Sequence, residues 1–288
     1  MAKTPNRGMD RFRGRTLIIA TQHGKEEVIA PELFNSLGVN CKVVSGLNTD
    51  QFGTFSGEIK RKGTALEAAQ KKAHAALALF EASLVVASEG SFGPHPYYSF
   101  IPGNEELLLF IDQENNLTLV ARYLTTETNY AHQAITAMDQ LKTFCEQMGF
   151  PEHGLILKAN HPDKAPLFYK ELRNEADLFA QSSTLLNKGY TLMAETDMRA
   201  MRNPTRMKAI HQATLRLVEL LQSECPQCGA PGYAKTEAIE GLPCQLCGTP
   251  TRSAKAYAYA CSSCGYQEER KREDKRHEEP MYCDVCNP

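Results

Sequence analysis

Four C-x-x-C motifs constrain the folding of this chain more than any other feature. Eight of the ten cysteines fall in these motifs, all between Cys225 and Cys286. Two thiolates separated by two residues can face one tetrahedral Zn2+, and a second motif completes a closed structural site. The alternatives are a disulfide framework or a redox motif, and neither fits four such motifs in a chain that we expect to stay reduced. The sequence therefore predicts two structural zinc ions, bound by Cys225, Cys228, Cys244, Cys247, Cys261, Cys264, Cys283 and Cys286.

Two ways of pairing the four motifs satisfy the spacing rule. In sequential pairing, the first motif joins the second and the third joins the fourth. In nested pairing, the first and fourth motifs form one site around an inner site made by the second and third. The alternating residues within 251–260 run like a strand into Cys261, whereas the segment after Cys228 and the charged residues 268–279 do not resemble strands. We therefore favour nested pairing and leave sequential pairing open.

Residues 16–222 alternate between apolar runs and segments of helical periodicity. Predicted strands cover residues 16–20, 39–44, 84–87, 155–159 and 190–194, and predicted helices cover 26–37, 65–82, 129–148, 168–186 and 204–221. Residues 88–96, which are rich in Gly and Pro, are predicted to form a loop. Residues 107–111 and 117–123 are predicted to form an antiparallel hairpin. This order predicts an α/β fold with a mixed, mostly parallel sheet covered by helices. The expected organisation is a basic tail (1–15), a phosphate- or nucleotide-binding-like α/β domain (16–222) and a small double zinc ribbon (223–288).

Composition excludes several classes of protein. Hydrophobic residues make up 42% and charged residues 23% of the 288 residues, which is typical of a globular chain. The net charge of -2 provides no global attraction for nucleic acid or an anionic membrane. No apolar run is long enough to cross a bilayer, and the basic first residues lack the apolar core of a secretory signal. We expect a cytoplasmic protein in which Cys41 and Cys145 are small buried hydrophobic residues.

Ligands of open α/β sheets collect beyond the carboxyl ends of strands, so the loops at those positions supply the candidate site residues. Thr21 and Lys25 lie where a helix begins, a place that favours phosphate, although Glu26 and Glu27 would also satisfy that helix end. Glu89 follows an apolar run and is a candidate for holding Mg2+ or activating water, or else a surface residue in a turn. The last loop offers candidate catalytic carboxylates and candidate phosphate-binding arginines, unless they form a plain salt-bridge network. These are Glu195, Asp197, Arg199, Arg202 and Arg206. Within the same loop, Asn203 directly precedes Pro204 and is the predicted N-cap of the helix that follows.

Three segments together resemble the inosine/xanthosine triphosphate pyrophosphatase family and its Maf-like relatives. They are Ala20-Thr21 with Gly24-Lys25, then Thr64-x-x-Glu67-x-Ala69-x-x-Lys72-Ala73, and an apolar run ending in Ala87-Ser88-Glu89-Gly90. The resemblance covers residues 16–95 and implies triphosphate contacts from Thr21, Lys25 and Lys72, with Glu89 assisting metal and water. His23 and Ser88 depart from the family pattern, its C-terminal Ser-His-Arg is not evident, and the ribbons are foreign to it. By its spacing alone, Glu67 is a capping-box residue of the helix that Thr64 opens.

These observations lead to two functional expectations. The first is a Mg2+-dependent hydrolase of a nucleotide or related phosphoanhydride, with a small phosphorylated ligand as substrate and the ribbons as a structural or interaction module. The second is a non-catalytic protein whose ribbons dock nucleic acid or a protein partner. No membrane partner is expected. The whole chain also resembles an uncharacterised bacterial domain family with an Asn-Pro-Thr-Arg segment, here Asn203 to Arg206, before C-terminal ribbons.

Overall fold

The computed structural model describes residues 7–21, 23–43, 63–170 and 172–288. They belong to two compact units, one of Arg13–Leu217 and one of Val218–Pro288 together with the N-terminal segment that ends at Phe12. Part of the basic tail (residues 1–6) and all of residues 44–62 lie outside the described residues. Within the tail, α1 (Arg7–Phe12) is helical. None of the described helices combines the length and the apolar character needed to cross a bilayer.

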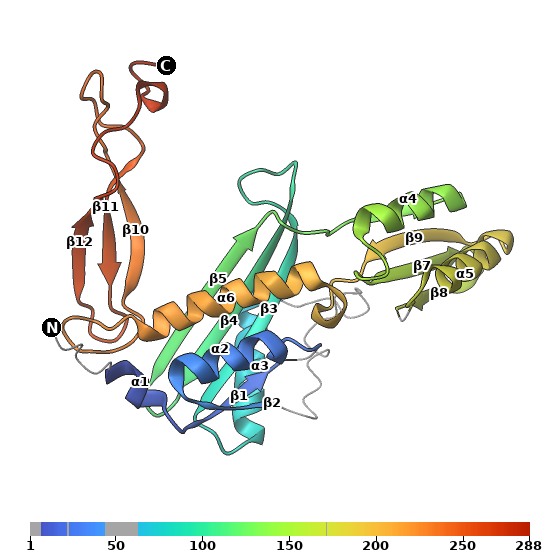
Figure 1. Cartoon of the computed structure of the whole chain (residues 1–288), viewed down its shortest axis with the longest axis horizontal. Coiled ribbons are helices and arrows are strands. Elements are labelled where there is room, and N and C mark those ends of the chain that lie inside the picture. The colour runs from blue at the N-terminus through green and yellow to red at the C-terminus, as the bar shows by residue number, and fades with distance from the viewer. Residues whose placement is uncertain (1–6, 22, 44–62, 171) are drawn as a thin grey trace. The chain divides into compact units, whose positions relative to one another are not determined.

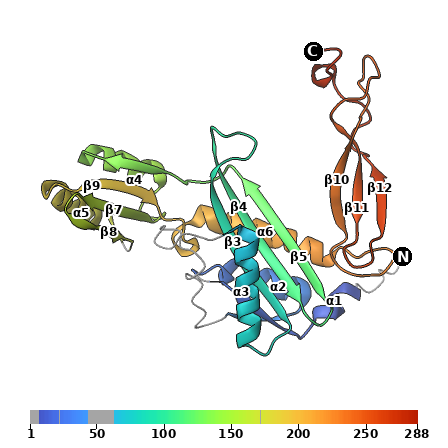
Figure 2. The same cartoon turned by 180° about the vertical axis from the view of Figure 1, so that it is seen from behind.

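The first sheet of the larger unit has five strands in the order β2-β1-β3-β4-β5. Their bounds are β1 (Thr16–Ala20), β2 (Asn40–Val43), β3 (Leu84–Pro94), β4 (Pro102–Asp112) and β5 (Leu117–Thr125). Helix α3 (Ala65–Leu79) covers one face with its alanines, while α2 (Glu26–Leu37) and α6 (Pro204–Gln222) lie on the other (Figures 1 and 2). The central strands β1, β3 and β4 are therefore buried on both sides, as their continuous apolar runs require.

The expected mostly parallel sheet is wrong. Among the described strands of this sheet, only β1 pairs in parallel, with β2 and β3, whereas β3, β4 and β5 form an antiparallel meander. The reason is that β3 does not stop at Ala87 but continues to Pro94, so the expected loop 88–96 is mostly strand and leads into a hairpin. A hairpin connection returns the chain antiparallel, and only helical crossovers produce parallel neighbours.

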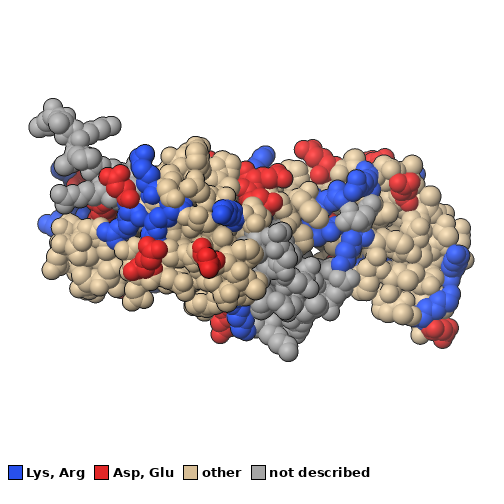
Figure 3. Space-filling view, turned by 90° about the horizontal axis from the view of Figure 1, so that it is seen from below, with Lys and Arg blue, Asp and Glu red and all other residues tan. Residues whose placement is uncertain are grey.

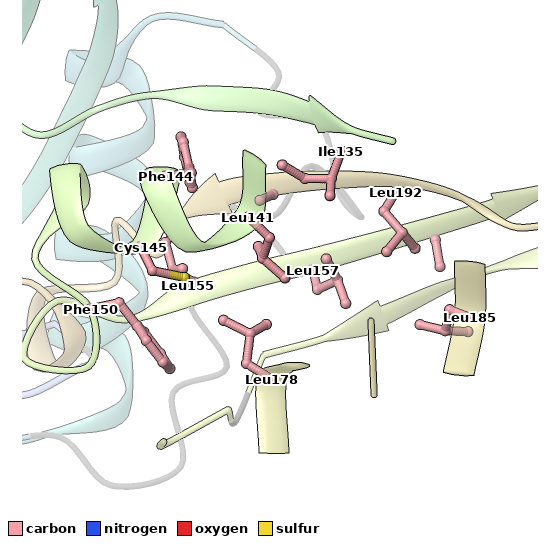
Figure 4. Packing of buried hydrophobic residues seen from close by; sticks show 12 residues of the cluster. Ile135, Leu141, Phe144, Cys145, Phe150, Leu155, Leu157, Leu178, Leu185 and Leu192 are labelled. Atoms are coloured by element: carbon pink, nitrogen blue, oxygen red, sulfur yellow. The ribbon is translucent and has the colours of Figure 1, made fainter. Parts of the chain in front are cut away.

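Strands within residues 132–196 of the larger unit form a second sheet. The sequence alone did not distinguish this sheet from the first. Its order is β6-β9-β7-β8 and all its pairs are antiparallel. The bounds are β6 (His132–Ile135), β7 (Leu155–His161), β8 (Lys164–Tyr169), β9 (Thr191–Thr196), α4 (Met138–Met148) and α5 (Glu175–Asn187). In Figure 4, Leu141 and Phe144 of α4 lie in the same core as Leu157 of β7 and Leu192 of β9.

Two helices of this second sheet are shorter than predicted because polar side chains fix where they begin. The Gln140 side chain accepts hydrogen bonds from the backbone N–H groups of Thr136 and Ala137, so α4 begins at Met138 and not at residue 129. Asn174 caps α5 through the N–H of Asp177, at 2.8 Å. The residues before each cap pair as β6 and β8.

Most other local predictions are confirmed. Thr64 and Glu67 form the capping box of α3, with bonds of 2.8 and 3.2 Å between each backbone N–H and the opposite side chain. Asn203 caps α6 by accepting a hydrogen bond from the N–H of Arg206 at 2.9 Å. Cys145 is buried in the second core, where desolvation raises its pKa to about 11. Cys41 is only partly buried, because β2 lies at an edge of the first sheet.

The smaller unit is built on a three-stranded antiparallel sheet in the order β10-β11-β12. Its strands are β10 (Ala234–Glu240), β11 (Ala254–Ala260) and β12 (Gln267–Lys271). The predicted strand before Cys261 is therefore confirmed. The expectation that the flanking segments lack strands is wrong, because charged and alanine-rich residues on a half-exposed three-stranded sheet carry little apolar alternation.

Candidate functional site

The eight clustered cysteines form two groups of four, and in each group the Sγ atoms lie within 4.8 Å of one another. Cys225 and Cys228 join Cys261 and Cys264, while the second and fourth motifs supply the other group. Four Sγ–Sγ distances, two in each group, are 3.7 to 3.9 Å. A tetrahedron with Zn–S bonds of about 2.3 Å has edges of about 3.8 Å, whereas a disulfide brings sulfurs to about 2.05 Å. The geometry is compatible with a tetrahedral metal ion in each group.

The observed pairing is interleaved, so both the nested and the sequential arrangement are wrong. The strand directions explain why. Ala260 at the end of β11 pairs with both Ala234 at the start of β10 and Gln267 at the start of β12. An antiparallel meander therefore brings the first and third motifs to one end of the sheet and the second and fourth to the other.

Each cysteine motif adopts the same tight turn. The carbonyl of the first cysteine accepts a hydrogen bond from the N–H four residues later, at 2.9 to 3.0 Å in all four motifs. In three of them that residue is a glycine with φ between 70° and 75°, namely Gly229, Gly248 and Gly265. Residues with side chains rarely adopt this left-handed conformation, so the glycines let both thiols face the same point. Asn287 takes the place of glycine in the fourth motif.

A second candidate site is a cluster of buried charges around residues 88–90 of β3, which we call the charge cluster. It consists of Lys25, Lys72, Glu89, Glu106 and Arg206, together with Ser88. Every member is buried. Charged side chains are almost never fully buried unless they are paired, so five in one place indicate a functional or strongly constrained position.

Lys25 begins α2 and reaches across the sheet to β3. Its Nζ donates to the hydroxyl of Ser88 at 3.1 Å and to the carbonyl of the same residue at 3.3 Å. Burial lowers the pKa of Lys25 to about 7, and the charges of Arg206 and Lys72 lower it further while those of Glu106 and Glu89 oppose the shift. Thr21, which directly follows β1, is buried as well.

Arg206 and Glu106 form an ion pair whose side chains are both 0% exposed. Nε of Arg206 donates to Oε1 of Glu106 at 2.8 Å, and a second nitrogen donates to the carbonyl of Met198. The pair lies directly over Gly90, where an added Cβ would collide with the guanidinium and with the carboxylate. Glycine at this position is thus required for the pair to lie flat on the strand.

The third part of the cluster is an ion pair of 2.5 Å between Lys72 of α3 and Glu89 of β3. Because side chains alternate along a strand, Glu89 faces α3 while Ser88 and Gly90 face α2 and α6. The pairing of β1 with β3 ends at Ala20 and Ala87, so in the described part of the sheet β3 has no β1 neighbour at residues 88–90. The carboxyl end of β1, which Thr21 directly follows, therefore adjoins residues 88–90 of β3.

Among the other predicted site residues, Glu195, Asp197 and Arg199 have partners outside this cluster. Glu195 of β9 pairs with Lys158 of β7 at 2.8 Å, on the second sheet. The Asp197 carboxylate accepts hydrogen bonds from two side-chain nitrogens of Arg199, the shorter at 2.6 Å. Arg199 also donates a hydrogen bond to the carbonyl of Lys170. The carbonyl of Arg202 accepts the N–H of Gly154 at 2.7 Å. Only Arg206 of this group belongs to the charge cluster.

Sequence reasoning missed Glu106. It lies opposite Gly90 in the register of β3 and β4, immediately before the buried run Leu107–Ile111. A carboxylate adjoining five consecutive apolar residues was the available signal, because such a group must find a buried cation.

The fold and the two sites define an α/β protein with a buried charge cluster, followed by a unit with two interleaved groups of four cysteines. The chain belongs to the family described as a domain of unknown function, DUF6671, whose model matches residues 72–288. The match includes Lys72, Glu89, Glu106, Arg206 and all eight clustered cysteines. No curated protein matches the chain, and no similarity to the inosine/xanthosine triphosphate pyrophosphatases is found.

Proposed function

We propose that the α/β unit is a Mg2+-dependent hydrolase of a nucleotide or a related phosphoanhydride, and that each group of four cysteines holds a structural zinc ion. The observation that supports the hydrolase best is the gathering of Thr21, Lys25, Lys72 and Glu89 at the end of β1. These residues come from three segments that lie far apart in the sequence. Burial strengthens their interaction with charge, since the local dielectric constant is well below that of water.

In this proposal the phosphates of the ligand exchange partners with the Lys72–Glu89 ion pair. The Lys72 ammonium would turn to a phosphate oxygen, and the Glu89 carboxylate would then be free to hold a Mg2+ ion or to orient an attacking water. Lys25 and the α2 amino end bind a second phosphate oxygen. Mg2+ would supply charge neutralisation on the phosphate oxygens. Arg206 and Glu106 already neutralise each other and lie against Gly90.

The expected catalytic role of Glu195 and Asp197 finds less support, because each carboxylate is engaged by a cation outside the cluster. The same holds for phosphate binding by Arg199.

Charge favours this proposal over nucleic-acid docking by the ribbons. Residues 223–288 carry ten acidic and eight basic side chains. Two zinc ions bound by eight thiolates would add four more negative charges. Taken over the whole chain, the face drawn in Figure 3 carries both acidic and basic side chains. A net negative module repels phosphates, so we assign the ribbons a structural role.

The test is release of pyrophosphate and orthophosphate from a panel of nucleoside triphosphates with Mg2+. Glu89→Gln should lower the rate at least about 100-fold, the usual contribution of a positioned acid–base group. The matched control is Glu105→Gln, a more exposed glutamate of β4 that pairs with Arg122. Its rate should equal that of the wild type. If wild type and Glu89→Gln show the same background rate with every nucleotide, the hydrolase proposal is wrong.

A further inference from the structure

The charge cluster contains one more cation than its carboxylates can neutralise. Lys72 pairs with Glu89, and Arg206 pairs with Glu106. Lys25 is the third cation, and among the described residues its Nζ contacts only the hydroxyl and carbonyl of Ser88. The hydroxyl and carbonyl dipoles of Ser88 stabilise a buried ammonium group much less than a carboxylate would.

Charged groups surround Lys25 on every element packed around it. Arg206 of α6 and Lys72 of α3 disfavour its protonated form, and Glu106 of β4 and Glu89 of β3 favour it. Glu26 and Glu27 lie on its own helix, in the first turn of α2. Desolvation by burial is the largest of these influences, and together they lower the pKa of Lys25 to about 7. Near neutral pH, the empty cluster therefore exists in two forms that differ by one proton.

We propose that anion binding at this cluster is coupled to the uptake of one proton by Lys25. The inference rests on the proposed phosphate site and adds how that site is regulated. The entering anion supplies the negative partner that Ser88 cannot provide, so the ammonium form becomes favourable even where it is buried. The ligand class is a small tetrahedral dianion or the phosphate group of a larger molecule.

Because anion binding and protonation of Lys25 are coupled, the proton uptake determines how the affinity for the anion depends on pH. Below pH 7 Lys25 is already protonated, and affinity should be independent of pH. Above pH 7 the anion must bring a proton with it, so the association constant should fall about tenfold for each pH unit. A hydrolase built on this site would lose substrate affinity on the alkaline side without losing its fold.

Sulfate is the suitable probe, because it is a tetrahedral dianion that does not itself take up protons near pH 7. Isothermal titration calorimetry of the full chain, at pH 6 and pH 8 in buffers of different ionisation enthalpy, counts the protons bound with each sulfate. We expect about 0.9 proton at pH 8 and about 0.1 at pH 6, from a pKa of about 7.

Two variants identify the group that takes up the proton. Lys25→Arg keeps a permanent charge and should bind sulfate at pH 8 without proton uptake. Lys25→Met should bind sulfate weakly at both pH values, also without uptake, and it serves where the larger arginine prevents folding. Circular dichroism of each variant confirms that the fold is intact.

The outcomes separate this inference from the proposed function. Sulfate binding by the wild type without proton uptake, or uptake that persists in both variants, overturns the inference and leaves the phosphate site standing. Failure of both sulfate and pyrophosphate to bind overturns the two together. Activity lost in Glu89→Gln with no proton uptake in the wild type leaves only the proposed function.

Discussion

The two candidate sites are encoded in opposite ways along the chain. All eight clustered cysteines lie within residues 225–286, in motifs whose members are two residues apart. The charge cluster draws its members from residues as distant as Lys25 and Arg206. The ligands of a C-x-x-C metal site can thus be recognised from a few adjacent residues, whereas the partners in a buried ion pair can be recognised only from the tertiary structure. Even a C-x-x-C motif, which is recognisable from the sequence alone, does not determine which second motif completes its metal site.

The largest expected effect is on the zinc sites, where ligand pairing can be counted directly. Metal analysis should find two zinc ions in the wild type. The double variant Cys225→Ser/Cys261→Ser removes ligands of one group and should retain one zinc. Cys225→Ser/Cys283→Ser damages both groups and should retain none. If the pairing were nested, Cys225→Ser/Cys261→Ser would retain no zinc and Cys225→Ser/Cys283→Ser would retain one.

Removing both zinc ions with a chelator should unfold the ribbon unit, because binding energy at such sites is folding energy of about 10 kcal/mol or more. Limited proteolysis should then cleave within residues 223–288 while the α/β unit stays resistant. Equal protection of the ribbon unit with and without chelator would contradict a structural role of the metal.

Breaking the buried Arg206–Glu106 pair should have the next largest effect. Arg206→Met leaves Glu106 buried without a cation and should lower the free energy of unfolding of the α/β unit by about 3–5 kcal/mol. Arg122→Met removes a partly exposed pair with Glu105 on the same sheet, and it should lower that energy by about 1 kcal/mol or less. Urea unfolding measures both, and similar losses in the two variants would mean that burial does not distinguish these pairs.

Lys25→Met should have a pH-dependent effect on stability. The folded state lowers the pKa of Lys25 from 10.5 to about 7, so between these values the unfolded chain binds more protons than the folded one. The wild type should therefore gain stability relative to Lys25→Met as pH rises from 7 to 10, by at most about 1.4 kcal/mol per unit. Denaturant unfolding of both proteins at pH 7, 8 and 9 checks the sign, and a constant difference would argue against a depressed pKa.

The smallest effect is expected from the capping box of α3. Thr64→Ala removes the hydroxyl that accepts the N–H of Glu67 and should lower stability by about 1 kcal/mol. Thr118→Ala on β5, outside any cap, serves as the control in the same thermal unfolding assay. A loss as small as that of the control would show that α3 is fixed by its alanine face alone.

Much of the local structure could be predicted because its causes lie within a few residues. The capping residues Thr64 and Asn203 were read from short motifs, and the structure confirms both. The long β3 was cut short because Gly90 and Gly93 read as turn residues. Gly90 instead provides room for the Arg206 guanidinium, which arrives from a helix that begins more than a hundred residues later. Glu106 was missed for the same reason, since its partner is that arginine.

By itself, the sequence determined which cysteines can bind metal, because two thiolates within one tight turn can face the same tetrahedral ion. It also determined where several helices begin, because caps act over three or four residues. Only the tertiary structure decided which cysteine motifs share an ion, because the strand directions of the β10–β12 meander set which ends meet. Likewise, Lys25 acquires an unusual proton affinity through burial and through four charges from other elements. Coulomb interactions act through space, and no spacing along the chain reports them.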